Sequence, residues 1–452
     1  MTRSRHRLVA VLFLVLVTLT GCNYSSPTEQ SSSQASVSGT SLPSPVSTSY
    51  RPQFPTPVST ESPIYPTSAP RPSQVAVTPD IEQFKHNPPS VTMLAKDPIV
   101  FSADSDAMVW TVQGKDDLTL WLGYLTSQDN ITVKAAHPVA KWNGSLSVVS
   151  IVPSPDRNYL AVLLRDSSMG FNDANLLWTV NLTTNLAQSL PNLAFQEAYR
   201  SFYSTTSHYI IGWLDSNRIV LQTNLAPAII ARDGSSFTKV TWLSQPSQVQ
   251  TALSPDRTTF FSEVISGGDS GYWLYQVDGS NPRKVSGSNS FKPLYEPKWS
   301  ADNKHISFLT SQDGGSTSLQ LNLLETTKNS QQVLTPQQGW DASPAWTPDG
   351  SRVAFLRANS NVTNADYQST EQNSTNIFIA KADGSVPTQL THLSEAKNRA
   401  LSWTSEGKYL VLSSTDSSGK NSIVSVSASD GSVTTLIPMP DGYIAVFPLV
   451  LK

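Results

Sequence analysis

A short turn motif recurs along this chain, and it constrains the fold more than any other feature of the sequence. Variant copies read WTPDGSRVAFL, WSADNKHISFL and WTSEGKYLVLS, and they begin at Trp346, Trp299 and Trp403. Two further copies, LSPDRTTFFSE and PSPDRNYLAVL, begin at Leu253 and Pro153. Repeats of about 40–50 residues that are built from short strands predict the blades of a β-propeller.

Two weaker copies, which begin at Phe101 and Trp213, bring the number of repeats to seven. The clearest intervals between acidic residues are 302 − 256 = 46 and 349 − 302 = 47. We therefore predict an all-β propeller of seven blades, each of four antiparallel strands, with six blades as the alternative. The acidic anchors of the seven copies are Asp104, Asp156, Asp215, Asp256, Asp302, Asp349 and Glu406.

Turn chemistry explains the motif without any catalytic role. Proline presets φ at the second turn position, aspartate caps nearby amides, and glycine accepts conformations that other residues resist. A second turn, Asp-Gly-Ser, follows at residues 233–235, 278–280, 383–385 and 430–432. An acidic residue of this motif occurs in every blade, whereas a single active site would need only one such residue. We therefore interpret these carboxylates as structural. The structural turn residues that we predict are Asp156, Asp256, Asp302, Asp349, Asp383 and Asp430.

The segments around these turns have the composition of strands. Residues 353–356, Val-Ala-Phe-Leu, are apolar at every position, which indicates a strand covered on both faces. Each blade is thus expected to run strand, turn, strand, loop, strand, turn, strand. The tail YIAVFPLVLK, residues 443–452, is expected to form a last strand that closes the ring, since closure removes exposed sheet edges.

These residues resemble the TolB-like propeller repeat, in which a W-S-P-D-G-x-x-I-A-F pattern precedes I-Y-x-x-D-x-D-G and a closing L-T. The closing pair corresponds to Leu334-Thr335 and Leu390-Thr391. The resemblance covers roughly residues 90–440 and is strongest from Ser254 onward. The resemblance implies a β-propeller fold. The α/β domain that precedes the propeller in members of the Tol system has no counterpart here, which argues against a role in that system.

The N-terminus has the three parts of an export signal. Arg3, Arg5 and Arg7 precede an apolar run from Leu8 to Leu19, which is shorter than the roughly 20 residues that a spanning helix needs. The run ends in Leu-Thr-Gly-Cys, which resembles the lipobox of bacterial lipoproteins. Cys22 is the only cysteine of the chain. We predict cleavage before Cys22 and lipidation of its thiol; an ordinary signal peptide or an uncleaved anchor is the alternative.

The stretch after Cys22 is dominated by Ser, Thr and Pro, which bury too little apolar surface to offset the entropy cost of ordering. We expect a disordered tether that carries the folded part away from the membrane. The predicted domains are a signal peptide at 1–21, the lipidated cysteine with its tether at 22–80, and the propeller at 81–452.

The chemistry-bearing residues form no recognisable catalytic, cofactor or metal motif. The net charge of −3 offers no general attraction for nucleic acid, and none is expected as a partner. The six histidines show no short paired spacing, and there is no G-x-S-x-G elbow or phosphate-binding glycine loop. Residues 166–173 and 416–421 are rich in oxygen ligands, but we interpret them as surface loops. We predict no catalytic residue, no cofactor and no metal.

Aromatic side chains are the remaining candidates for a binding surface. Trp299, Trp346 and Trp403 share one position of the repeat and are therefore expected in the core. The tryptophans outside that register, which we expect to be freer for exposure and binding, are Trp142, Trp242 and Trp340.

Together these features favour a lipid-anchored protein of the cell envelope, outside the cytoplasm, at the cell surface or in the periplasm. Its propeller would be a monomeric, non-catalytic scaffold that binds an unknown envelope protein. The alternatives are a receptor or sensor for a glycan or small ligand, and a hydrolase or lyase whose carboxylates gather in the central channel.

Overall fold

The computed structural model describes most of the chain from residue 89 onward, within one compact unit, Pro72–Lys452. The described ranges are 89–99, 106–126, 131–166, 174–190, 209–222, 227–240, 250–264, 270–286, 292, 294–311, 318–336, 339–358 and 374–451. The predicted signal peptide, Cys22 and tether lie outside them, and so does Asp104. Among the described residues no helix is long and apolar enough to cross a membrane.

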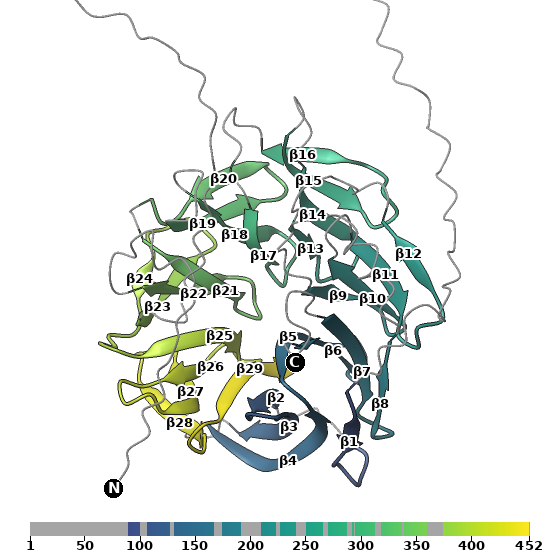
Figure 1. The fold of residues 1–452 in the computed structure, drawn as a ribbon. Coiled ribbons are helices and arrows are strands. Elements are labelled where there is room, and N and C mark those ends of the chain that lie inside the picture. The colour runs from purple at the N-terminus through teal and green to yellow at the C-terminus, as the bar shows by residue number, and fades with distance from the viewer. Residues whose placement is uncertain are drawn as a thin grey trace, which may run out of the picture. The chain divides into compact units, whose positions relative to one another are not determined.

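The regular elements of the described chain are all strands, and they form seven antiparallel sheets (Figure 1). The prediction of seven blades is confirmed, and the alternative of six is wrong. Blade 1 consists of β1 (Val91–Met93), β2 (Asp106–Gln113), β3 (Asp117–Thr126), β4 (Thr132–Asn143) and β29 (Ile444–Leu451). Blade 2 consists of β5 (Leu146–Pro153), β6 (Tyr159–Asp166), β7 (Ala174–Asn181) and β8 (Leu186–Ser189).

The remaining blades each use four consecutive strands. Blade 3 has β9 (Tyr209–Asp215), β10 (Arg218–Gln222), β11 (Pro227–Ala231) and β12 (Phe237–Lys239). Blade 4 has β13 (Thr251–Leu253), β14 (Thr259–Val264), β15 (Gly271–Gln276) and β16 (Arg283–Ser286). Blade 5 has β17 (Leu294–Trp299), β18 (His305–Ser311), β19 (Leu319–Glu325) and β20 (Ser330–Val333). Blade 6 has β21 (Asp341–Trp346), β22 (Arg352–Ala358), β23 (Thr375–Lys381) and β24 (Thr388–Gln389). Blade 7 has β25 (Lys397–Trp403), β26 (Tyr409–Thr415), β27 (Asn421–Ser427) and β28 (Val433–Pro438).

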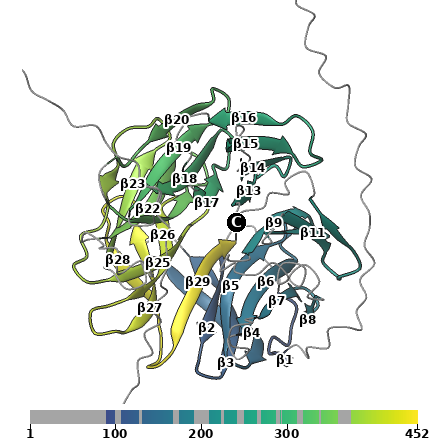
Figure 2. The same cartoon turned by 45° about the horizontal axis from the view of Figure 1, so that its top comes forward.

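The seven sheets close into a ring. Each blade places one strand innermost, and that strand contacts the innermost strand of the next blade in an unbroken cycle: β29, β5, β9, β13, β17, β21, β25 and back to β29. Both ribbon views show these strands facing the centre (Figures 1 and 2).

The C-terminal strand closes this ring, as the tail of the sequence predicts. β29 pairs antiparallel with β2, from Ala107 opposite Leu451 to Gln113 opposite Ile444. The innermost strand of blade 1 therefore comes from the opposite end of the chain. β1 adds a fifth strand to the outer edge of this blade by pairing with β4.

The core lies between neighbouring blades rather than in one central volume. Val353 and Phe355 of β22 belong to an apolar cluster shared with blade 5, whereas Ala354 and Leu356 belong to a cluster shared with Trp403 of blade 7. All four of these β22 side chains are buried. The uninterrupted apolar sequence of this strand thus follows from cover on both faces.

The two faces of the ring differ in their connections. The first-to-second and third-to-fourth strand connections lie on one face, here called the turn face, where the longest are residues 277–282 and 382–387. The second-to-third connections and those between blades join strand ends on the opposite face, here called the loop face. The loop face receives the longest connections, which are residues 190–208, 240–250 and 359–374.

Candidate functional site

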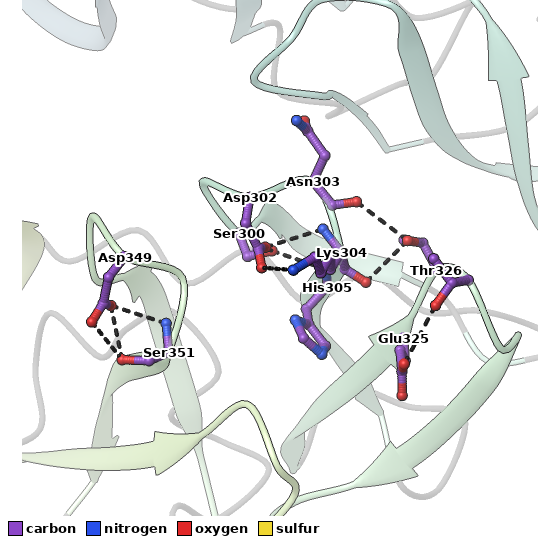
Figure 3. Close-up of polar contacts among 10 residues, drawn as sticks. Ser300, Asp302, Asn303, Lys304, His305, Glu325, Thr326, Asp349 and Ser351 are labelled. Atoms are coloured by element: carbon purple, nitrogen blue, oxygen red, sulfur yellow. Dashed lines mark hydrogen bonds and ion pairs between the residues drawn. The ribbon is translucent and has the colours of Figure 1, made fainter.

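The predicted turn carboxylates of the first hairpin all lie on the turn face, where each accepts hydrogen bonds inside its own turn. In blade 6 the Thr347 hydroxyl donates to Asp349 Oδ1 at 2.6 Å, and it accepts the amide N–H of Arg352 at 3.0 Å. The amide of Ser351 also donates to Asp349 Oδ1, at 3.0 Å (Figure 3). The hydroxyl thus links the carboxylate to the first amide of the next strand.

The same relay occurs in blades 2, 4 and 5. The hydroxyls of Ser154, Ser254 and Ser300 donate to Asp156, Asp256 and Asp302 at 2.5, 2.6 and 2.6 Å. Each hydroxyl accepts the amide five residues later, at 2.9–3.0 Å. Figure 3 shows the blade 5 copy, in which Asp302 contacts both Ser300 and Lys304. The serine or threonine of the motif therefore matters as much as the aspartate.

The Asp-Gly-Ser turns use a simpler arrangement. Asp383 Oδ1 accepts the amide of Ser385 at 2.9 Å, and Asp430 Oδ1 accepts the amide of Ser432 at 3.0 Å. The intervening Gly384 and Gly431 have φ values of 79° and 72°, a left-handed conformation that favours glycine.

These contacts hold the turn carboxylates in their ionised form. The hydroxyl of Thr347 and the N–H and hydroxyl of Ser351 lower the pKa of Asp349 to about 2. No three His, Cys, Asp or Glu side chains of the described residues come together as a possible metal site. On the described part of the turn face, each of these carboxylates caps its own turn.

The tryptophans of the repeat connect blades by hydrogen bonds. The indole Nε1 atoms of Trp213, Trp299, Trp346 and Trp403 donate to main-chain carbonyls of the preceding blade, at 3.0, 3.4, 3.0 and 2.9 Å. The acceptors are Val152, Ala252, Lys298 and Ala345, all on innermost strands. Trp346 and Trp403 are buried, as expected, whereas Trp299 is partly buried against the cluster between blades 4 and 5. The hydrogen bonds of these indoles could not be predicted from the sequence.

Two of the three candidate binding tryptophans can be placed. The expectation of an exposed Trp142 is wrong, because its side chain is fully buried and its ring packs edge-on against Trp178 at 5.9 Å. Trp142 lies in the apolar cluster between blades 1 and 2, and Val91 of β1, which pairs opposite it, packs against the same cluster. Trp340 is half-buried against the apolar cluster between blades 5 and 6. Trp242 lies outside the described residues.

Three buried or half-buried carboxyl groups, which the sequence did not single out, lie at the loop-face ends of blades 4 to 6. Asp341 forms a bidentate ion pair with Arg357, at 2.7 and 3.0 Å, and also accepts from the Thr335 hydroxyl at 2.6 Å. Burial raises the pKa of Asp341 despite this pairing. Because Thr335 and the Leu321 amide belong to blade 5, Asp341 joins blades 5 and 6.

Glu296 occupies a bulge of β17, where its φ is 46° and the pairing register with β18 shifts. Its Oε2 accepts the amide of Ser343, the corresponding bulge residue of blade 6, at 2.8 Å. Gln250 Oε1 in turn accepts the amide of Glu296 at 2.9 Å. Burial raises the pKa of Glu296, although Lys298 lies nearby.

Glu263 of β14 is 1% exposed, and burial raises its pKa to about 8. Its Oε2 accepts the amide of Leu294 in blade 5 at 3.2 Å. All three carboxyl groups therefore bond to a neighbouring blade, an arrangement that connects the blades.

Comparison with known proteins agrees with the repeat. Residues 266–445 match the family model described as the TolB beta propeller domain. A curated relative, the Tol-Pal system protein TolB of Alcanivorax borkumensis, is 27% identical over 84 residues, which is 19% of this chain and 19% of that protein. The chain thus matches about a fifth of the relative's length. The propeller is TolB-like.

Several solved structures are similar in fold at low sequence identity. TolB from Acinetobacter baumannii has a TM-score of 0.43 and 12% identity, covering 76% of this chain and 66% of that one. A putative TolB from Agrobacterium tumefaciens has a TM-score of 0.38 and 15% identity, covering 77% and 99%. A putative 6-phosphogluconolactonase from Bacteroides uniformis has a TM-score of 0.46 and 13% identity, covering 76% and 98%.

Proposed function

We propose that this chain is a lipid-anchored protein of the bacterial cell envelope whose propeller is a non-catalytic scaffold that binds another envelope protein through its loop face. The lipid would be attached at Cys22, and residues 22–80 would form the tether. The propeller would be a rigid platform outside the cytoplasm.

The difference between the two faces carries this proposal. On the turn face the connections are short, and their polar groups are used by the caps of Asp349 and its counterparts. The longest connections join strand ends at the loop face, as is typical where a rigid scaffold positions binding segments. A TolB-like propeller, in a relative whose name places it in the Tol-Pal system, is consistent with a protein-binding role.

Photo-crosslinking from defined positions tests the contact surface. A photoreactive phenylalanine analogue would replace Ser418 or Glu395, two exposed residues in loop-face connections, in cells that express the full chain. Matched control positions are Thr258 and Ser432, which are exposed in turn-face connections. We expect a protein adduct from the loop-face positions and none from the controls. Equal adducts from both faces, or none from either, would contradict the proposal.

A separate variant tests the anchor. Cys22→Ala should move the protein from the membrane fraction to the soluble envelope fraction, because a multiply acylated cysteine supplies most of the membrane affinity. Retention of Cys22→Ala in membranes would refute lipidation. It would not affect the interpretation of the crosslinking experiment, which tests the binding surface separately.

A further inference from the structure

Glu263 is an acid at a repeat position where blades 1 and 7 have the uncharged residues Thr111 and Ser413. The strand pairings align it with Leu163, Leu309 and Leu356 in blades 2, 5 and 6, all of which are 0–1% exposed. Blade 3 has Gln222 at the same position. The fold therefore accepts leucine or glutamine here, so an acid is not required for forming a blade.

The Glu263 carboxyl group lies at the seam between blades 4 and 5, and only one of its oxygens has a partner. Oε2 accepts the Leu294 amide from blade 5 at 3.2 Å, while Oε1 has no hydrogen-bond partner among the described residues. The Glu263 amide itself donates to the Gln250 carbonyl over 3.5 Å. The group thus bridges two blades with unused hydrogen-bonding capacity.

Burial, which raises the pKa of Glu263, outweighs the Leu294 amide, which lowers it. Tyr272, opposite Glu263 on β15, is the titratable group that faces it, and its hydroxyl donates to the Lys292 carbonyl at 2.8 Å. The charged residues next to Leu294 on the blade 5 side are Lys292 and Glu296. The adjoining cluster is apolar, with Phe261, Tyr272 and Leu294 among its members. None of the ion pairs within the described residues includes Glu263.

The seam between blades 4 and 5 has further contacts, among them the 2.9 Å bond from the Glu296 amide to Gln250 Oε1 and the apolar cluster that contains Phe261. The Trp299 indole reaches the Ala252 carbonyl over 3.4 Å, the longest of the four indole bonds between blades. A hydrogen bond of this length contributes less than one near 2.9 Å. Glu263 therefore holds this seam together with these contacts, and its buried carboxyl group makes one part of the contact dependent on charge.

We propose that Glu263 makes the seam between blades 4 and 5 a proton-controlled joint, in which the neutral carboxyl group keeps the seam closed and loss of its proton favours an open seam. Opening exposes the carboxyl group to water, where the charged form carries no desolvation penalty. In the closed seam the same group is buried beside apolar rings, which disfavour its charged form. This inference is independent of the proposed scaffold function.

The sign of the effect follows from linkage. Burial raises the pKa of Glu263 from its ordinary value of 4.5 to about 8 in the closed state. Opening therefore releases a proton between these two values, and the open fraction rises with pH across that interval. Below this interval the open fraction is at its lowest and no longer depends on pH, and above it the open fraction again becomes constant. Acidification should tighten the joint.

Hydrogen exchange followed by mass spectrometry tests this joint in the full chain. Peptides that contain β14 and β17 would be compared with peptides that contain β22 and β26 in the same sample, at pH 5.5 and 7.5. The comparison within one sample cancels the intrinsic pH dependence of exchange. We expect the protection of β14 and β17, relative to β22 and β26, to fall by up to about tenfold per pH unit in the unaltered protein.

Two variants test whether Glu263 causes the pH dependence. Each introduces a residue that another blade has at the aligned position. Glu263→Gln and Glu263→Leu should abolish the relative change, whereas Glu406→Gln, at an exposed acid in blade 7, should leave it intact. If the relative protection does not change with pH in the unaltered protein, or if all four peptides change together, the joint does not exist. Persistence of the change in Glu263→Gln would equally overturn the proposal.

Discussion

The indole Nε1 of Trp346 donates a 3.0 Å hydrogen bond to the main-chain carbonyl of Lys298, a residue 48 positions earlier in the sequence and one blade away. The same contact recurs from Trp213, Trp299 and Trp403. A side chain at one repeat position therefore joins each of these blades to the innermost strand of the blade before it.

Replacing Trp346 with phenylalanine should lower the free energy of unfolding by about 0.5–1.5 kcal/mol beyond the loss of ring volume, because the hydrogen bond from the indole to the Lys298 carbonyl is lost. Trp142→Phe is the matched control, since the fully buried indole N–H of Trp142 has no hydrogen-bond partner. Urea unfolding of both variants gives the difference. Equal losses would show that the indole bond contributes nothing.

The turn relay makes a second prediction. Thr347→Val keeps the shape of the side chain but removes the hydroxyl that donates to Asp349 and accepts the Arg352 amide. We expect a loss of about 1–3 kcal/mol, since the half-buried Arg352 amide and the Asp349 carboxylate both lose the Thr347 hydroxyl. Thr434→Val, on the exposed outer strand β28, should change stability by less than about 0.5 kcal/mol. Thermal unfolding of both proteins measures this contrast.

The local part of this fold could be predicted from the sequence. Asp349 with Gly350 and Asp383 with Gly384 identify turns because turn geometry depends on a few consecutive residues, and the residues 353–356 identify a strand covered on both sides. The ring size and its closing strand then followed from counting these turns and from the apolar tail.

The contacts between blades could not be predicted, because they join residues far apart in sequence. Trp142 appeared free to be exposed, since no local pattern shows that β1 pairs opposite it. Asp341 meets Arg357 and Thr335 only after two blades pack together. Glu263 could have been noticed by aligning second strands, where the other blades have uncharged residues, but its partner Leu294 could not.

The ion pair between Asp341 and Arg357 gives a third prediction. Asp341→Leu should cost about 3–5 kcal/mol, because it leaves the Arg357 guanidinium, bound at 2.7 Å, without its counterion. The double variant Asp341→Leu, Arg357→Met should recover part of that loss. Denaturant unfolding of the two single variants and the double variant measures the coupling between the side chains. Strict additivity of the two single losses would mean that the pair contributes no coupling energy.

Ring closure supplies a fourth prediction. Leu451 of β29 is 2% exposed within the cluster shared by blades 1 and 2, so Leu451→Ala should cost about 2–5 kcal/mol. Leu186→Ala is the control, because Leu186 of β8 is 65% exposed and should tolerate the change. Calorimetry of both variants tests whether the C-terminal strand stabilises the ring. A similar melting temperature for the two would argue against that role.

The last prediction concerns global stability and pH. Because burial raises the pKa of Glu263 from 4.5 to about 8, the folded protein holds a proton that the unfolded chain releases, and stability falls as pH rises through that interval. An interval of about 3.5 pH units at about 1.4 kcal/mol each corresponds to about 5 kcal/mol at most. Glu263→Leu removes this dependence, so its advantage over the unaltered protein should grow between pH 5 and pH 8 when guanidinium unfolding is measured at both values. Other ionisable groups contribute equally to both proteins and cancel in the difference. A difference that stays constant across this range would show that Glu263 ionises as readily when folded as when unfolded, and that its buried position imposes no penalty on the charge.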